Sequence, residues 1–124
     1  MIDMYQEELL DHYKNPRNAG SLSNPDIEFS DTNPLCGDEI KVTAKIKNET
    51  IEDIKFDARG CAISVAAASK LSEVLKNKPI SEIKRMDNKE VLDLLGVPIS
   101  PMRLKCALLS LRALQKGIYQ NSGE

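Results

Sequence analysis

The sequence predicts an α+β fold, in which an antiparallel sheet of three strands is covered on one face by helices. Two observations support this prediction. Apolar and charged residues alternate in two consecutive runs, 39–47 and 51–59, and apolar residues recur at helical spacing through most of the chain that follows. Since 41% of the 124 residues are hydrophobic and 29% are charged, the chain is able to bury one core. We expect a single α+β sandwich domain over residues 1–124.

The two alternating runs predict a β-hairpin. One face of the first run is wholly apolar and consists of Ile40, Val42, Ala44 and Ile46. The residues between the runs, Asn48-Glu49-Thr50, leave room only for a tight turn, so the two strands are antiparallel. We expect Lys47 to pair with Ile51.

This register brings two of the three cysteines together. It places Cys36 opposite the residue that follows Cys61, and Cys61 opens a predicted helix over residues 62–76. Ser100-Pro101 is typical of an N-cap followed by proline at the first helical position, so Cys106 lies in the first turns of the last helix. A helix N-terminus favours the thiolate, which is the form that binds metal or attacks sulfur.

Three further elements complete the predicted fold. An opening helix stops before Asn15-Pro16, because the residue before proline avoids the helical region. Residues 26–32 alternate and predict the third strand. Residues 87–90 form a capping box that begins a short helix, which ends at Gly96.

Composition limits the function. The cysteine count is odd and no signal peptide opens the sequence, so we expect no disulfide framework and a reducing, cytoplasmic location. The net charge of -2 and the lack of a basic patch with interleaved aromatic residues argue against a nucleic-acid partner. No apolar run is long enough to cross a membrane, so we expect no membrane partner.

Four motifs together resemble the IscU/NifU/SufU family of iron-sulfur cluster assembly scaffolds. The resemblance covers nearly the whole chain in order, spacing and flanking residues. The motifs are Asp11-His12-Tyr13-Lys14-Asn15-Pro16-Arg17-Asn18, Cys36-Gly37-Asp38, Gly60-Cys61-Ala62-Ile63-Ser64 and Lys105-Cys106-Ala107.

The resemblance implies a SufE/IscU-like sandwich and a scaffold or carrier protein, not an enzyme. Such a scaffold accepts sulfur from a cysteine desulfurase, assembles a cluster, most simply [2Fe-2S], on Cys36, Cys61 and Cys106, and passes it to acceptor apoproteins. It stays open whether two chains form a homodimer that shares one cluster.

Asp38 is the leading candidate for the fourth ligand, since a cluster normally takes four protein ligands and this chain has three cysteines. A carboxylate oxygen suits iron less well than a thiolate, so it leaves one corner labile. Because three cysteines and an aspartate also satisfy tetrahedral zinc, a zinc-containing, SufU-like sulfur acceptor is the main alternative. A zinc hydrolase ranks lower, since no glutamate stands beside the cysteines as a general base.

Lys105 and His12 are two further candidates for the site. Lys105 is either a solvated lysine or an auxiliary cation beside Cys106 that lowers the pKa of the thiol and offsets an anionic cluster. Lys105 matches the SufU type, where the IscU type has histidine, but the step from Cys61 to Cys106 is too short for the SufU insertion. His12, the only histidine, is expected on the surface or in packing contacts and not as a ligand.

Overall fold

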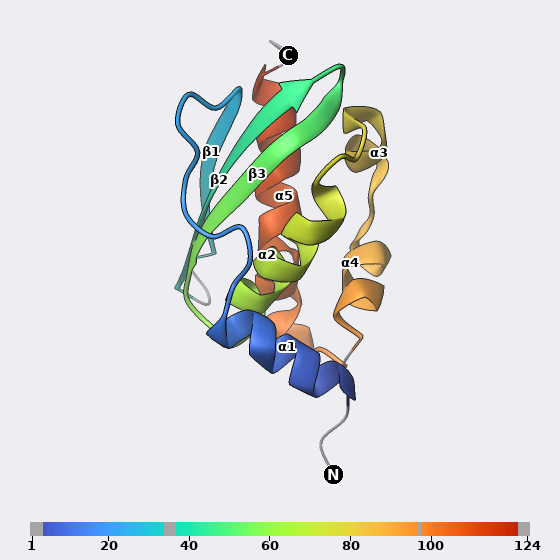
Figure 1. Cartoon of the computed structure of the whole chain (residues 1–124). Coiled ribbons are helices and arrows are strands. Elements are labelled where there is room, and N and C mark those ends of the chain that lie inside the picture. Colours follow the sequence, from blue (N-terminus) through green and yellow to red (C-terminus); the bar gives the residue numbers. More distant parts are fainter. Residues whose placement is uncertain (1–3, 34–36, 97, 122–124) are drawn as a thin grey trace.

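Helices cover one face of a three-stranded antiparallel sheet in the computed structural model, which describes residues 4–33, 37–96 and 98–121 (Figure 1). The predicted α+β class is therefore confirmed. In chain order the elements are α1 (Met4–Lys14), β1 (Ile27–Asn33), β2 (Asp38–Lys47), β3 (Thr50–Arg59), α2 (Ala62–Leu75), α3 (Ile80–Arg85), α4 (Asn88–Leu95), a single 3-10 turn η1 (Pro101–Arg103) and α5 (Leu104–Asn121).

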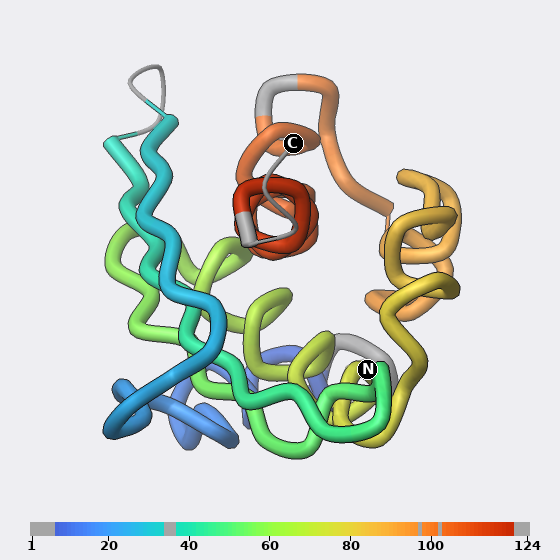
Figure 2. Tube along the Cα trace, turned by 90° about the horizontal axis from the view of Figure 1, so that it is seen from above, coloured from blue at the N-terminus to red at the C-terminus, as the bar shows by residue number. Residues whose placement is uncertain are grey.

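The helices form two layers beside the sheet, which has the strand order β1-β2-β3. Helix α5 packs on β1 and β2, while α2 packs on β3, and both helices lie on the same face (Figures 1 and 2). Helices α3 and α4 lie beyond α5 as seen from the sheet, and α1 packs against α2, where its polar contacts reach Ser69, Lys70 and Glu73 in the second half of that helix. The close approach of α5 to β1 requires Gly117, because a Cβ there would lie 2.7 Å from Ile27 Cγ2.

The core fills the space between the sheet and the two central helices. Its sheet side is the predicted apolar face of the hairpin, in which Ile40, Val42 and Ala44 are almost fully buried. Its helical side comes from α2 and α5, and from single residues of the outer helices. The largest fully buried side chains are Ile27, Ile40, Ile51, Ile54, Leu71, Leu75, Ile83, Leu95, Leu111, Leu114, Val42 and Val91.

The register of the hairpin differs from the prediction at the turn and agrees with it at the other end. Lys47 pairs with Thr50, not with Ile51, because the turn contains only Asn48 and Glu49, both at positive φ, as two-residue hairpin turns require. A bulge between the Lys45 and Ile46 pairings then shifts the ladder by one residue. From there to the Glu39–Arg59 pair the expected register holds, so the start of β2 lies beside the end of β3.

The segment that follows α1 crosses the outer face of the sheet. Ala19 forms a parallel bridge with Phe56 at the β3 edge, and the Leu22 N–H donates to Thr43 Oγ1 at 3.0 Å. Thr43 points away from the helices, and this segment buries it completely. The face opposite the helices is therefore covered along this path.

The helix boundaries follow the predicted signals closely. Helix α1 ends at Lys14, and Asp87 caps α4 by accepting a hydrogen bond from the Glu90 N–H at 3.0 Å. Ser100 precedes the 3-10 turn, so α5 begins at Leu104, three residues later than a helix capped directly by Ser100. Helix α3 was not predicted. No helix among the described residues combines the length and apolar character needed to span a membrane.

Candidate metal centre

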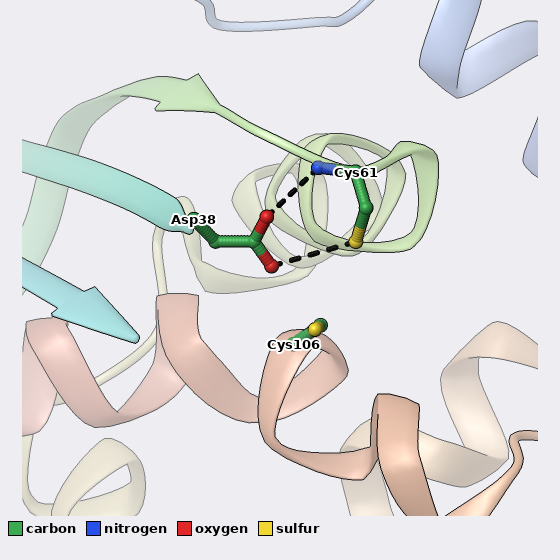
Figure 3. A group of neighbouring side chains, drawn as sticks. All are labelled: Asp38, Cys61 and Cys106. Atoms are coloured by element: carbon green, nitrogen blue, oxygen red, sulfur yellow. Dashed lines mark hydrogen bonds between the residues drawn. The ribbon is translucent and has the colours of Figure 1, made fainter. Parts of the chain in front are cut away.

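Two thiols and one carboxylate converge where β2 begins and where α2 and α5 begin (Figure 3). One ligand atom each from Asp38, Cys61 and Cys106 lies within 4.8 Å of the other two. Asp38 is the first residue of β2, Cys61 is the N-cap of α2, and Cys106 is the third residue of α5. The predicted convergence is therefore present for Cys61 and Cys106, while Cys36 lies outside the described residues.

The carboxylate of Asp38 holds Cys61 through two contacts. Asp38 Oδ1 accepts a hydrogen bond from the Cys61 N–H at 2.8 Å, and Cys61 Sγ donates to Oδ2 at 3.4 Å. Cys61 gives α2 no side-chain cap, so the carboxylate from β2 caps the helix instead. It lies where the positive end of the helix dipole favours an anion. Asp38 itself is 0% exposed, which the turn composition around it does not predict.

Gly60 lets the carboxylate approach the joint between β3 and α2. Its φ of +140° lies in the region that favours glycine. A Cβ at this position would lie 2.9 Å from Asp38 Cα and would collide with the carboxylate. Any residue other than glycine at position 60 would therefore push the Asp38 side chain out of its place.

Solvent reaches the two described thiols unequally. Cys61 is half-buried, whereas Cys106 is 1% exposed beneath it. Solvent reaches Cys61 and not Cys106, because α5 packs beneath α2 at this end and covers its own third residue. An incoming group meets Cys61 before it meets Cys106.

Lys105 lies beside the centre and not in it. Its side chain is exposed and lines a groove of about 220 Å³ together with Arg112 and Lys116 of α5 and the last residues of β1. Lys116 is paired with Asp31 at 2.9 Å. The three cations follow one stripe of α5 at helical spacing, so the groove next to the centre is positively charged although the chain as a whole carries -2.

The donor set fits a thiophilic metal. Thiolate sulfur and carboxylate oxygen are both ligands of zinc, and thiolates are the usual ligands of iron in iron-sulfur clusters. The atoms come from three separate elements, so their spacing is set by the fold. Asp38, Cys61 and Cys106 could hold such a metal, with Cys36 two residues from Asp38 in sequence.

A comparison with known families agrees with this donor set. The family model of the NifU-like N terminal domain matches residues 4–123. The chain belongs to this family. It is 41% identical over 137 aligned positions to the zinc-dependent sulfurtransferase SufU of Bacillus subtilis, covering 97% of this chain and 92% of the relative. It is 34% identical over 118 positions to the iron-sulfur cluster assembly scaffold protein IscU of Escherichia coli, covering 92% and 91%.

Solved structures agree with the fold of a NifU-like domain. The N-terminal domain of a NifU-like protein from Brucella abortus superimposes with a TM-score of 0.79 at 19% identity, covering 98% of this chain and 96% of that one. A protein described as a scaffold for iron-sulfur cluster assembly in the SUF system of Fervidobacterium islandicum gives a TM-score of 0.77 at 26% identity, covering 90% and 94%.

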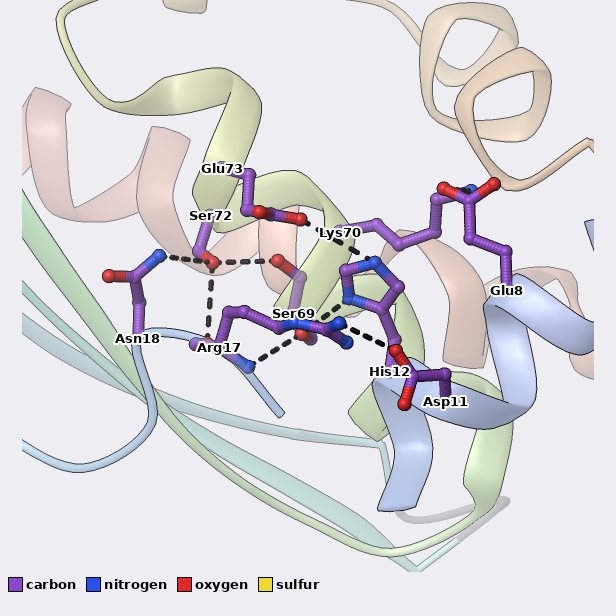
Figure 4. A network of polar contacts seen from close by, with 9 residues as sticks. All are labelled: Glu8, Asp11, His12, Arg17, Asn18, Ser69, Lys70, Ser72 and Glu73. Carbon is purple, nitrogen blue, oxygen red and sulfur yellow. Dashed lines mark hydrogen bonds and ion pairs between the residues drawn. The ribbon is translucent and has the colours of Figure 1, made fainter. Parts of the chain in front are cut away.

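The motif at residues 11–18 fastens α1 to α2 through polar contacts (Figure 4). Ser69 Oγ of α2 accepts a hydrogen bond from the Arg17 N–H at 2.8 Å and lies 2.7 Å from His12 Nδ1. Asn18 Nδ2 donates to Ser72 Oγ at 3.0 Å, and the buried Lys70 pairs with Glu8 at 3.1 Å. The motif is therefore structural, and His12 packs as predicted.

The contacts of His12 favour the tautomer with its proton on Nε2. Since Ser69 Oγ already accepts from Arg17, its own proton is free to bond His12 Nδ1, and His12 Nε2–H then faces Glu73 Oε1 at 3.5 Å. Burial lowers the pKa of His12 below its ordinary 6.5. The charges of Arg17 and Lys70 lower it further, and those of Glu73 and Glu8 raise it. His12 is thus neutral at pH 7.

The sequence-based reasoning missed the polar face of α2. Ser69, Lys70 and Ser72 are all buried in a helix that was described only by its apolar stripe. Their spacing carried a signal, because polar residues one to three positions apart within an apolar helix predict a polar partner on that side. The partner is the segment 12–18.

Gly60→Ala tests the close approach to Asp38, with Gly20→Ala as its matched control. Both glycines have positive φ, but nothing lies within 4 Å of a Cβ built at Gly20. We expect the Gly60 variant to lose about 1–3 kcal/mol more unfolding free energy than the Gly20 variant, because it overpacks the joint. Urea denaturation of both variants measures the difference. Equal losses of unfolding free energy would show that the positive φ alone accounts for the need for glycine at position 60.

Asp38→Asn separates the cap from the metal ligand. The amide oxygen still accepts from the Cys61 N–H, while the second oxygen becomes an NH₂ group that cannot bind metal. We expect the fold to persist and the zinc affinity to fall by at least about 100-fold, more than is usual for a residue that only supports a ligand. Circular dichroism and chelator competition measure the two effects. Unchanged zinc affinity would remove Asp38 from the ligand set.

The histidine should make stability depend on pH. Because the pKa of His12 is lower in the folded chain than in the unfolded chain, the unfolded state binds more protons below pH 6.5. We expect the unfolding free energy to fall as the pH drops from about 6.5 towards the folded-state pKa. Urea unfolding of the metal-free protein between pH 7.5 and 5 measures this loss. A His12→Gln variant that keeps the same slope would contradict it.

Proposed function

We propose that this chain is a scaffold on which an iron-sulfur cluster is assembled and from which the cluster passes to acceptor apoproteins. The convergence of two thiols and a carboxylate within 4.8 Å is the observation that carries the proposal. Relatives named as IscU scaffolds in Archaeoglobus fulgidus and E. coli, which are 36% and 34% identical, align with more than nine-tenths of the chain. Cys36 supplies the third thiol, and the chain acts as a carrier and not as an enzyme.

Sulfur arrives as the terminal sulfur of a persulfide on a cysteine desulfurase. A thiolate of the scaffold attacks that sulfur, one S–S bond forms as the other breaks, and the desulfurase cysteine leaves as a thiolate. Of the two described thiols, the half-buried Cys61 is the one that such a persulfide reaches first. Ferrous iron and an external reductant then complete a [2Fe-2S] cluster. A reducing, cytoplasmic location is part of the proposal.

The positively charged groove along α5 favours the binding of an acidic partner protein. Lys105, Arg112 and Lys116 line this groove, and of the three only Lys116 forms an ion pair with another described residue, Asp31. The groove adjoins the centre because Cys106 follows Lys105 in sequence and Asn33 pairs with Asp38 across the β1–β2 ladder. A desulfurase or an acceptor apoprotein that presents carboxylates here would be steered towards the thiols.

A zinc-containing sulfurtransferase is the second candidate. It is favoured by the 41% identity to SufU of B. subtilis and by Lys105, which matches the SufU type at the position before the third cysteine. Against it, the alignment extends over 137 positions although this chain has 124 residues, so the relative carries residues that this chain lacks. The IscU relative of A. fulgidus aligns over 115 positions, fewer than the chain has.

Anaerobic reconstitution tests the function. We expect iron and sulfide to produce the visible absorbance of a cluster in the parent protein, and Cys→Ser at Cys36, Cys61 or Cys106 to abolish it, because a hydroxyl replaces a thiolate poorly at a soft site. Lys105→Met is the matched control. It removes the exposed ammonium group next to Cys106 but no ligand atom of the centre, so it should keep the absorbance.

The same preparations distinguish the two candidates. A scaffold transfers its cluster to an apoferredoxin, and the transfer is measured by the absorbance of the holo product. A zinc sulfurtransferase accepts radiolabelled sulfur from a desulfurase with zinc bound and without iron. If the zinc-loaded protein passes sulfur to a thiol acceptor while no cluster survives reconstitution, the scaffold proposal fails. Undiminished absorbance in a Cys→Ser variant would exclude that cysteine as a ligand.

A further inference from the structure

The four buried serines among the described residues fall into two pairs. Ser69 and Ser72 are hydrogen-bonded within the network that fastens α1. Ser64 and Ser110 are each 1% exposed, and their hydroxyl oxygens have no hydrogen-bond partner. The only other buried side-chain nitrogen or oxygen without a partner in the described chain is Arg17 Nη1, which belongs to the α1 network.

The unpartnered serines share one position relative to the centre. Ser64 lies three residues after Cys61 in α2, and Ser110 lies four residues after Cys106 in α5. Residues three and four apart are neighbours on a helix, and helical side chains lean towards the turn on their N-terminal side. Helical spacing therefore places Ser110 on the face of α5 that carries Cys106, and Ser64 in the first turn of α2, which follows the N-cap Cys61.

Neither hydroxyl makes a hydrogen bond to the backbone of its own helix. A buried helical serine commonly donates to a carbonyl three or four residues earlier, as Ser72 does to the Ser69 carbonyl at 2.7 Å. For Ser64 the carbonyl four residues earlier belongs to Gly60, which lies outside the helix. Alanine would fill these sites with a better helix former and leave no buried hydroxyl unpaired, and three alanines follow Ser64 at 66–68.

We propose that Ser64 and Ser110 donate hydrogen bonds to the sulfurs of Cys61 and Cys106 when the centre is loaded. In the unloaded centre the Cys61 thiol already donates to Asp38, and a neutral thiol is a weak acceptor. Metal binding turns the thiols into thiolates, which accept charge-assisted hydrogen bonds. The two serines are positioning residues that stabilise the metal-loaded form and make no hydrogen bond through their hydroxyls in the metal-free form.

This inference rests on the proposed function, because it needs Cys61 and Cys106 to be ligands. Ser64→Ala, Ser110→Ala and the double variant test it with zinc alone as the probe. We expect the zinc affinity of each single variant to fall about 10-fold or more, as is usual when a group that supports a ligand is lost. We also expect the metal-free variants to unfold at the same or a higher urea concentration than the parent. Cobalt-substituted protein should show a shifted sulfur-to-metal absorption band.

Two controls make the experiment decisive. Ser72→Ala removes a buried but hydrogen-bonded hydroxyl from α2 and should lower the stability of the metal-free protein while leaving its zinc affinity unchanged. Ser110→Thr keeps the hydroxyl and should retain most of the affinity that Ser110→Ala loses.

The outcomes separate the inference from the function. If Ser64→Ala and Ser110→Ala bind zinc like the parent while Cys61→Ser and Cys106→Ser do not, the serine inference fails and the centre stands. If metal-free Ser64→Ala and Ser110→Ala lose stability with unchanged affinity, the hydroxyls are structural and the inference also fails. If Cys61→Ser and Cys106→Ser bind zinc normally, the proposed function itself fails.

Discussion

The hydrogen bond from the Cys61 N–H to the Asp38 carboxylate is the interaction on which the centre depends. It joins the start of β2 to the start of α2, two points that the hairpin register already brings close together. The bond requires Gly60, because no other residue leaves space for the carboxylate. One side chain therefore caps a helix, orients a thiol and offers an oxygen to a metal. These tasks are coupled, so a substitution at Asp38 or Gly60 that breaks the hydrogen bond to the Cys61 N–H acts on the fold and on the chemistry together.

The second half of the centre is positioned by packing. Helix α5 lies close to β1 because Gly117 has no side chain to keep it away from Ile27. This contact lies far along α5 from Cys106, which occupies the third position of the helix. Because a helix is rigid, fixing one end also fixes the position of the other. The apolar contacts along α5 therefore determine where Cys106 lies relative to Asp38 and Cys61. The spacing of the ligand atoms is thus set by packing in the core, although the ligands themselves lie at the edge of the core.

Much of this arrangement could be predicted from local patterns. The alternation of apolar and charged residues predicted the hairpin, and the capping signals predicted α4, because both features depend on residues close in sequence. The bulge after Lys45 could not be predicted, since it follows from the twist and length of the strands in three dimensions. The burial of Asp38 was missed because a turn composition says nothing about what packs over the turn. Helix α3 is six residues long and too short to show a period. For contacts distant in sequence, such as Ser69 with His12, local spacing indicates that a polar partner exists but not which segment supplies it.

The donor atoms come from β2, α2 and α5, and this has a consequence for the lifetime of the polypeptide. An unfolded chain holds these atoms far apart and binds a metal ion weakly, so nearly all of the binding free energy favours the native state. At a free metal concentration one thousand times the dissociation constant, this adds about 4 kcal/mol. Proteases degrade chains in proportion to how often they open. Degradation of the polypeptide by proteases should therefore slow as the centre fills with metal.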